Sequence, residues 1–247
     1  MTVNVEAYFK EVDEMPWGKL FYRLLWQQLD QADLGAVEPL KVLDFGAGFC
    51  KTAAYLAAAG HQVTAYEPNR EIAAHRYQTA NYRFLSGDFA EVKIPLQHEK
   101  YDLILLHNVL EYVEDRNEIL DFLWSLLVPG GRFSLVKHNP RGRIMVNAVL
   151  RDDPAQALAE LQGKAGQSVN FGKVIDYTNE WLLDWLDEKD TAVTGDYGIR
   201  MFYGLSQNSE IKFTEDWQEN MFRLESECQT DAIFKKIAMF RHFLWIK

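Results

Sequence analysis

The sequence has 247 residues, of which 48% are hydrophobic and 25% are charged, as in a globular protein with a full core. These proportions exclude a disordered tail, a fibrous protein and a small domain held together by disulfides. No uncharged apolar run reaches the length of a membrane span, and no basic stretch leads into an apolar one at the N-terminus. We therefore expect a cytoplasmic protein with no membrane anchor and no secretory signal.

Cysteine content and net charge argue against a metal site and against a surface that binds nucleic acid throughout. Cys50 and Cys228 have no Cys or His partners at ligand spacing, so we expect free thiols and no metal. The net charge of −10 argues against nucleic-acid binding over the whole surface. One basic segment is an exception, because no acid lies between Asp121 and Asp152. It is either a solvated loop or an anion-facing patch. Its basic residues are Arg132, Lys137, Arg141, Arg143 and Arg151.

Residues 40 to 137 alternate short apolar runs with amphipathic ones, which is the pattern of a parallel sheet covered by helices. The expected strands are 41–45, 62–68, 82–89, 101–107 and 132–138. The expected helices between them are 51–60, 71–80 and 115–127. The strand at 101–107 is apolar on both faces, which indicates a central, fully buried position.

Two segments do not fit this alternation. A helix is expected over 19–33, before the first strand, and a cap over 139–175, with one weak helix near 154–162. The remaining elements are a helix at 178–190 that Thr178 caps, a strand at 191–202, a helix at 215–229 and a strand at 238–246. We expect a single domain of α/β class. Its predicted parts are an N-terminal helical lid (1–39), a ligand-binding core (40–138), a cap insertion (139–175) and the rest of the sheet (176–247).

The turn after the first strand points to one kind of ligand. Gly46 and Gly48 allow a ligand to approach the backbone closely. The fingerprint for a dinucleotide needs a third glycine, and Lys51 occupies that position. The carboxylate of Asp44, at the end of the strand, would repel a pyrophosphate and attract a cation. The turn therefore favours a ligand that carries positive charge.

Acidic side chains also follow the next two strands. Glu67 can accept hydrogen bonds from the two hydroxyls of a ribose, and Asp88 can accept from the exocyclic amine of adenine. Phe89 offers a ring beside the base. In open α/β sheets the ligand binds outside the carboxyl ends of the strands, so these acids together indicate a positively charged adenosine derivative.

These motifs resemble the class I S-adenosylmethionine-dependent methyltransferases, over about residues 40 to 138 by motif and elsewhere by the order of elements. The resemblance implies a Rossmann-like, seven-stranded mixed sheet with helices on both faces and an antiparallel last strand. It also implies S-adenosylmethionine as the cofactor and a contact between His107 and that cofactor. The expected cofactor-binding residues are Asp44, Gly46, Ala47, Gly48, Glu67, Pro68, Asp88, Phe89, His107 and Asn108.

Four further segments look like the bacterial methyltransferases that esterify 5-carboxymethoxyuridine at the wobble position of transfer RNA. They are residues 24–30, 105–113, 123–150 and 196–202. The resemblance implies a carboxylate on a modified wobble uridine of tRNA as the methyl acceptor. A small-molecule methyltransferase is the alternative, and a nucleoside-binding module without catalysis is a third hypothesis.

The acceptor decides which side chains the chemistry needs. A carboxylate is already ionised, so it needs a cation to orient it, for which Arg141, Arg143 and Arg200 are candidates. An acceptor that carries a proton needs a base, which His107, Glu111 or His138 could supply. No catalytic residue is identified from these alternatives. The expected acceptor-site residues are Glu111, Tyr112, Asn139, Arg141 and Arg200.

Each of these side chains also has a structural alternative. His107 can pack without a chemical role, Glu111 can cap a helix, and Arg200 can form a structural ion pair. The tryptophans in the C-terminal half recur at helical spacing, which favours the core over base stacking. They are Trp181, Trp185 and Trp217.

Overall fold

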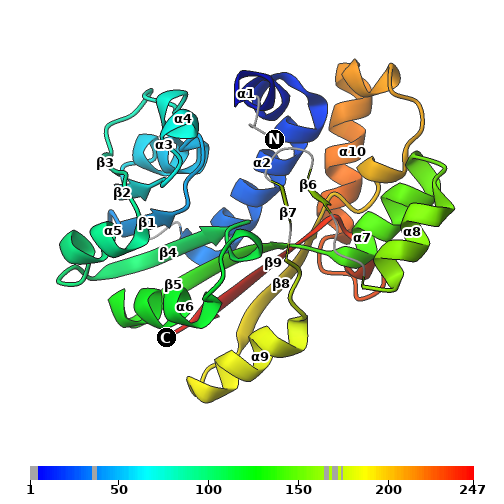
Figure 1. The fold of residues 1–247 in the computed structure, drawn as a ribbon. Helices are drawn as coiled ribbons and strands as arrows, with labels where there is room; N and C mark the ends of the chain where they lie inside the picture. The colour runs from blue at the N-terminus through cyan, green and yellow to red at the C-terminus, as the bar shows by residue number, and fades with distance from the viewer. Residues whose placement is uncertain (1–4, 35–37, 164–166, 169–171, 174) are drawn as a thin grey trace. The chain divides into compact units, whose positions relative to one another are not determined.

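The computed structural model describes residues 5–34, 38–163, 167–168, 172–173 and 175–247 (Figure 1). The chain forms two compact units, each made of three segments. The first unit comprises Met1–Ala32, Val136–Thr178 and Gly195–Phe243. The second unit comprises Asp33–Leu135, Asn179–Thr194 and Leu244–Lys247.

The sheet has seven strands in the order β3-β2-β1-β4-β5-β9-β8. Their bounds are β1 Lys41–Phe45, β2 Gln62–Tyr66, β3 Arg83–Leu85, β4 Tyr101–His107, β5 Leu127–His138, β8 Val193–Ile199 and β9 Phe240–Ile246. A separate antiparallel pair joins β6 (Gln167–Ser168) to β7 (Gly172–Lys173). All seven strands expected from the sequence are therefore present, and the predicted fold class is confirmed.

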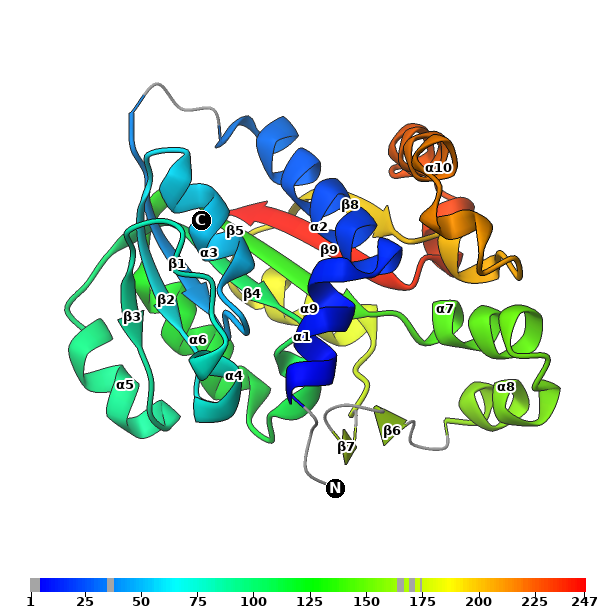
Figure 2. The same ribbon diagram turned by 90° about the horizontal axis from the view of Figure 1, so that it is seen from above.

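Strand directions follow from the backbone hydrogen bonds. β1 is parallel to β2 and β4, and β2 is parallel to β3. β9 runs the opposite way to β5, because Gly130 near the start of β5 donates to the carbonyl of Lys247, whereas Asn139, just after β5, donates to that of Met239. Figure 2 shows the reversed arrow of β9 beside β5. The antiparallel last strand is thus confirmed.

In the second unit, α3 lies on one face of the sheet, with α5 and α6 on the other (Figure 1). The helices of this unit are α3 Lys51–Ala58, α4 Arg70–Ala74, α5 Phe89–Leu96, α6 Arg116–Leu126 and α9 Asn179–Glu188. Phe133 and Trp245 stack at 4.6 Å between ring centroids, and neither is exposed. Burying a side chain of this size contributes about 1.5–3 kcal/mol. Of the three tryptophans predicted in the core, Trp185 packs edge-on against Trp245 and is 4% exposed, whereas Trp181 and Trp217 are half-buried.

Two sequence predictions in this unit were wrong in extent. The helix expected over 71–80 is only α4, which ends at Ala74. The strand expected over 82–89 is only the three residues of β3, and Phe89 begins α5, a helix that the strand pattern concealed. The cause is a capping box, in which Asp88 accepts from the backbone N–H of Glu91, whose side chain accepts from that of Asp88.

In the first unit, α2 accounts for the helix expected over 19–33, and α1 is an additional helix. The helices of this unit are α1 Val5–Glu14, α2 Pro16–Leu29, α7 Pro140–Met145, α8 Pro154–Leu161 and α10 Glu215–Cys228. The segment 139–175 is more helical than expected, because Asn139 caps α7 and Pro140 occupies its first turn. Part of the predicted cap, at 164–166, 169–171 and 174, lies outside the described residues.

Short 3-10 and π turns complete the fold. The 3-10 turns are Leu110–Tyr112, Tyr203–Leu205, Ile211–Phe213 and Phe234–Ile237, and the π turns are Asp30–Leu34 and Val146–Leu150. Cys50 and Cys228 are free thiols. None of the helices that the structure describes is long and apolar enough to cross a membrane. The described side chains include no cluster of three His, Cys, Asp or Glu that could hold a metal ion.

Candidate functional site

The register of the parallel strands brings the predicted cofactor residues to one level of the sheet. Asp44 pairs with Ala65 on β2 and with Leu105 on β4. Two residues further along in the direction of each strand, Gly46 is therefore level with Glu67 on one side and with His107 on the other. The glycine turn thus lies between an acidic and an imidazole side chain at the carboxyl ends of adjacent strands.

The two glycines of the turn have different neighbours. Gly46 has φ +77°, and a Cβ atom built on it would lie 2.4 Å from Cγ2 of Val109. Gly48 has φ +55°, and a Cβ atom there would meet no atom within 4 Å. Packing therefore requires the first glycine, whereas the second faces open space that a ligand can occupy. Ala47, between them, donates its N–H to the carbonyl of Tyr66 at 2.8 Å.

Glu67 connects the glycine turn to the loop after β2. The residue is 7% exposed, and its carboxylate accepts from the N–H groups of Gly48 and Asn69, both at 2.8 Å. Burial raises the pKa of Glu67, partly offset by these two hydrogen bonds. Pro68, which follows it, is exposed. Asn69, which the sequence analysis did not single out, caps α4 and orients this carboxylate.

Asp44 is the most perturbed acid of the turn. Burial, and to a smaller extent the negative charge of Glu67, raise its pKa to about 7, against the backbone hydrogen bond that Ala53 provides. A positive charge placed beside these two carboxylates would favour their ionised forms. The pair therefore suits a cation better than a diphosphate.

Asp88 and Phe89 stand at the start of α5 rather than at the end of a strand. Asp88 is exposed, and one of its carboxylate oxygens accepts from the N–H of Glu91 at 2.9 Å. The ring of Phe89 packs edge-on against Phe45 and Phe122. Tyr66 donates its hydroxyl to the carbonyl of Gly87 at 3.1 Å, which ties this segment to the end of β2.

His107 ends β4 as predicted. Its Nε2 lies 2.8 Å from the hydroxyl oxygen of Ser134 on β5, and burial lowers its pKa to about 3. The imidazole is therefore neutral and a weak base at physiological pH. Asn108, the next residue, has φ +55° and a buried Oδ1 without a hydrogen-bond partner among the described residues. An acceptor of this kind fits a bound ligand.

The predicted acceptor-site residues lie in both units. Glu111 is buried and Tyr112 half-buried in the 3-10 turn after β4, in the second unit. Asn139 belongs to the first unit, where its amide donates to the carbonyls of Lys236 and Ala238 at 3.0 and 2.7 Å. That side chain therefore holds α7 in place.

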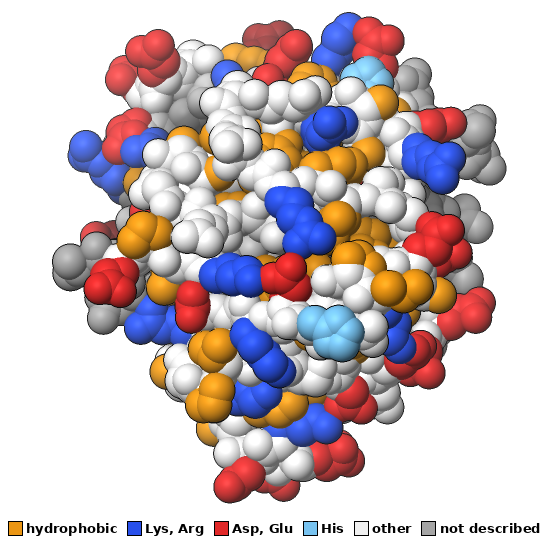
Figure 3. Space-filling model, turned by 90° about the vertical axis from the view of Figure 1, so that its left-hand side faces the viewer, with side chains coloured by type: hydrophobic (Ala, Val, Ile, Leu, Met, Phe, Trp, Pro, Cys, Tyr) orange, Lys and Arg blue, Asp and Glu red, His pale blue; other side chains and the backbone are white. Residues whose placement is uncertain are grey.

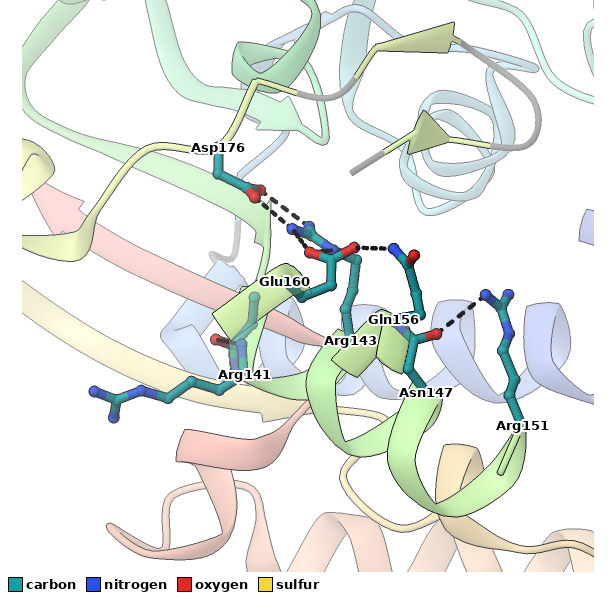
Figure 4. Close-up of polar contacts among 8 residues, drawn as sticks. Arg141, Arg143, Asn147, Arg151, Gln156, Glu160 and Asp176 are labelled. Atoms are coloured by element: carbon teal, nitrogen blue, oxygen red, sulfur yellow. Dashed lines mark hydrogen bonds and ion pairs between the residues drawn. The ribbon is translucent and has the colours of Figure 1, made fainter. Parts of the chain in front are cut away.

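The basic residues of the first unit between 136 and 151 do not share one environment. Lys137 is buried, and its ammonium donates to the carbonyl of Tyr177. Arg143 forms ion pairs with Glu160 and Asp176, as Figure 4 shows. Arg151 donates to Asn147, and the exposed Arg141 points away from this cluster (Figure 4). An anion-facing patch made by all of these residues is therefore not present in this unit.

Charges of both signs are mixed on the face over α3, α4 and α5. Figure 3 shows Lys and Arg side chains among hydrophobic ones there, with Asp and Glu interspersed. The described side chains of this face therefore form no uniform basic field of the kind that attracts nucleic acid.

Comparison with known proteins identifies the family. Residues 43–133 match a model described as a methyltransferase domain. The chain is 34% identical over 230 residues to the tRNA 5-carboxymethoxyuridine methyltransferase of Escherichia coli O157:H7, which covers 90% of this chain and 85% of that protein. It is 33% identical to the protein of the same name from Escherichia coli strain K12, with the same coverage.

The chain belongs to the class I S-adenosylmethionine-dependent methyltransferases. Solved structures with low sequence identity share the fold of this methyltransferase. A methyltransferase from Mesorhizobium loti is 16% identical, with a TM-score of 0.56 over 96% of this chain and 100% of that one. The plantazolicin methyltransferase BpumL, in complex with SAH and an analogue, is also 16% identical, with a TM-score of 0.58 over 98% and 88%. The cofactor is S-adenosylmethionine.

The residues of this methyltransferase fit that cofactor. Asp44 and Glu67 offer two buried carboxylates to a molecule with a positive sulfur, an ammonium group and a ribose. Gly48 leaves space beside the backbone, and Asn108 has a buried acceptor. When bound, S-adenosylmethionine would supply a methyl group on a sulfonium, from which a neutral thioether departs readily. Positioning therefore carries most of the catalysis.

Cofactor affinity is expected to rise with pH between about 5.5 and 7.5. Asp44, with a pKa of about 7 in the free protein, is mostly protonated at the lower end, so a cation must displace that proton to bind. Affinity should fall by up to tenfold per pH unit below about 7 and level off above it. Calorimetric titration with S-adenosylmethionine in buffers of different ionisation enthalpy measures both the affinity and the released proton. A flat profile in the wild type would show that Asp44 is not near the positive charge.

Proposed function

We propose that this methyltransferase transfers the methyl group of S-adenosylmethionine to the carboxylate of 5-carboxymethoxyuridine, at the wobble position of tRNA in the cytoplasm. The observation that carries the proposal is the 34% identity, over 90% of the chain, to a tRNA 5-carboxymethoxyuridine methyltransferase. The coverage extends through both units and not only the 91 residues of the methyltransferase domain, from 43 to 133.

The acid-base character of the two candidate histidines supports a carboxylate acceptor. Burial lowers the pKa of His107 to about 3 and that of His138 to about 4, the latter aided by the charges of Arg143 and Arg200. Neither imidazole is basic enough to take a proton from a hydroxyl or amine acceptor. A carboxylate has no proton to remove, because its pKa lies far below physiological pH.

The assignment of individual residues is part of this proposal. The ten residues expected from the motifs are assigned to the cofactor, and the five further residues expected from the sequence are assigned to the acceptor. The cofactor set is Asp44, Gly46, Ala47, Gly48, Glu67, Pro68, Asp88, Phe89, His107 and Asn108. The acceptor set is Glu111, Tyr112, Asn139, Arg141 and Arg200.

Nucleoside mass spectrometry of tRNA from a deletion strain tests this function. The methyl ester of 5-carboxymethoxyuridine should disappear and the free acid should accumulate, because the preceding steps are intact. Restoring the wild-type chain should restore the ester, whereas the Asp44→Asn variant should not. An unchanged amount of ester in the deletion strain would refute the proposed acceptor.

A small-molecule methyltransferase is the second candidate, and the net charge of −10 favours it, because RNA binding needs positive charge that faces phosphate. The same strain separates the two candidates. If tRNA nucleosides are unchanged while a methylated metabolite disappears from the extract, the acceptor is a small molecule.

The turnover number with saturating cofactor and tRNA is expected to vary less than about threefold between pH 6 and 9, because a carboxylate acceptor stays ionised over that range. Single-turnover rates with radiolabelled S-adenosylmethionine would measure this. A rate that rises tenfold per pH unit at the acid end would instead indicate that a base removes a proton from the acceptor.

A further inference from the structure

Arg200 stands in an unusual position at the end of β8. Its backbone has φ +60°, in the left-handed region that few residues other than glycine adopt. The guanidinium carbon lies 5.2 Å from the ring centroids of both Trp17 and Tyr203, and 5.9 Å from that of Phe240. Three aromatic rings from α2, β9 and the turn that follows Arg200 thus hold one cation. A strained backbone maintained in this way is typical of a functional position.

The guanidinium has no acidic partner. No carboxylate in the described part of the chain forms a hydrogen bond or an ion pair with it, and its Nε atom is buried without any acceptor. Arg143, in the same unit, shows the contrast, because two carboxylates neutralise it. A buried donor that bears charge costs free energy unless it is satisfied, so Arg200 calls for an anion from outside the chain.

The acid whose charge acts on Arg200 is Glu225, and its carboxylate is hydrogen-bonded to other groups. Glu225 on α10 is not exposed, and its carboxylate accepts three backbone N–H groups, from Met201 at 2.7 Å, Phe202 at 2.8 Å and Tyr203 at 3.1 Å. These bonds fix the turn that follows Arg200. Glu225 therefore organises the backbone that presents the guanidinium without forming an ion pair with it.

A second cation lies nearby. Lys212 is 6% exposed, its ammonium is 4.7 Å from the ring centroid of Tyr203, and it too has no ion pair among the described residues. Burial, and then the positive charge of Arg200, lower the pKa of Lys212. The half-buried guanidinium and the buried ammonium repel each other around one ring and create a local positive potential in a chain of net negative charge.

We infer that Arg200 is the anchor that binds the carboxylate of the methyl acceptor, with Lys212 as a supporting charge and Glu225 as a positioning residue. The identity of that carboxylate rests on the proposed function. A planar guanidinium matches a carboxylate better than an ammonium does. Methylation turns the carboxylate into a neutral ester, so the same contact also favours the substrate over the product.

Binding to two tRNAs tests the anchor. One carries 5-carboxymethoxyuridine and the other 5-methoxyuridine at the same position, and both are titrated against protein saturated with S-adenosylhomocysteine. Arg200→Gln should weaken binding of the carboxylate tRNA by about 10- to 100-fold and leave the methoxy tRNA within about twofold. Arg223→Gln, which removes an exposed arginine of α10, is the matched control and should leave the preference intact. Equal weakening of both tRNAs would mean that Arg200 contacts phosphate, and no weakening would also overturn the inference.

Glu225→Gln tests the positioning role. An amide cannot accept three N–H groups as a carboxylate does, so the turn should loosen and the preference for the carboxylate tRNA should fall, with KM raised more than kcat is lowered. Glu227→Gln, an exposed change on the same helix, is the control. Lower thermal stability with an unchanged preference would show that Glu225 is only structural.

The free nucleosides separate this inference from the proposed function. Wild-type protein should bind 5-carboxymethoxyuridine more tightly than 5-methoxyuridine, and Arg200→Gln should remove the difference. If tRNA is not methylated but this Arg200-dependent preference is present, the proposed tRNA substrate is wrong and the anchor stands. If tRNA is methylated but the preference does not depend on Arg200, the anchor is wrong and the function stands.

Discussion

Replacing Asp44 with asparagine is expected to weaken S-adenosylmethionine binding by roughly 100-fold, because a hydrogen bond to a charged group contributes about 1.5–3 kcal/mol. The change keeps the shape of the side chain and removes the charge that a cation requires. Isothermal titration at pH 7.5 measures the effect. Asp187→Asn, an exposed change on α9, is the matched control and should leave the affinity unchanged.

The same substitution should stabilise the protein without ligand. The pKa of Asp44 is raised from 3.8 to about 7, so the folded state holds a proton that the unfolded state has lost between those values. The contribution of Asp44 to the free energy of unfolding therefore falls as pH rises from about 4 to about 7. An uncharged asparagine avoids that loss. Thermal unfolding at pH 8 should give a higher midpoint for Asp44→Asn than for the wild type. Weaker binding together with a lower midpoint would indicate damage to the fold rather than loss of a cofactor contact.

Replacing each glycine of the turn with alanine is expected to have different effects, on the stability of the fold at Gly46 and on cofactor binding at Gly48. Gly46→Ala places a methyl group 2.4 Å from Val109 at φ +77°, so it should cost about 2–5 kcal/mol of stability and lower the amount of folded protein. Gly48→Ala meets no protein atom and should cost only about 1–2 kcal/mol for its positive φ. It should nevertheless weaken cofactor binding by about 10- to 100-fold, because its methyl group occupies ligand space.

Circular dichroism melts and cofactor titrations on the two variants provide this comparison. Gly60→Ala, at a positive φ outside the site, shows the effect of backbone strain alone. If Gly48→Ala binds S-adenosylmethionine as well as Gly60→Ala does, the space beside Gly48 does not receive the cofactor.

The sheet was predictable from the sequence because its strands are defined by burial. β1 and β4 have the predicted bounds, since their apolar runs end at polar or glycine residues at the edge of the sheet. The positions of Asp44, Glu67 and His107 followed from the strand ends, because parallel strands place those ends side by side. The cofactor class could therefore be inferred before any contact was known.

Helix starts were harder to predict because they depend on caps. Asp88 looked like the end of a strand, and only its reciprocal bond with Glu91 shows that it begins α5. The sequence also did not indicate that Asn139, which is proposed above for the acceptor site, caps α7 and donates to carbonyls almost a hundred residues away. A local sequence pattern contains the capping residue, but it does not show whether that side chain caps a helix or has another role.

Long-range partners were beyond sequence reasoning altogether. Arg143 and Arg200 were equal candidates for an acceptor cation, and the structure distinguishes them because Glu160 and Asp176 neutralise Arg143. The role of Glu225 left no sequence signal, because its three bonds are to backbone N–H groups.

The most direct test of the account is a reaction of purified protein with methyl-labelled S-adenosylmethionine and tRNA that carries 5-carboxymethoxyuridine. Among the nucleosides of the product, the modified wobble uridine should carry the label. Mild alkali should release this label as methanol, because it hydrolyses a methyl ester. Label on another nucleoside, label that survives alkali, or no transfer to this tRNA would contradict the account.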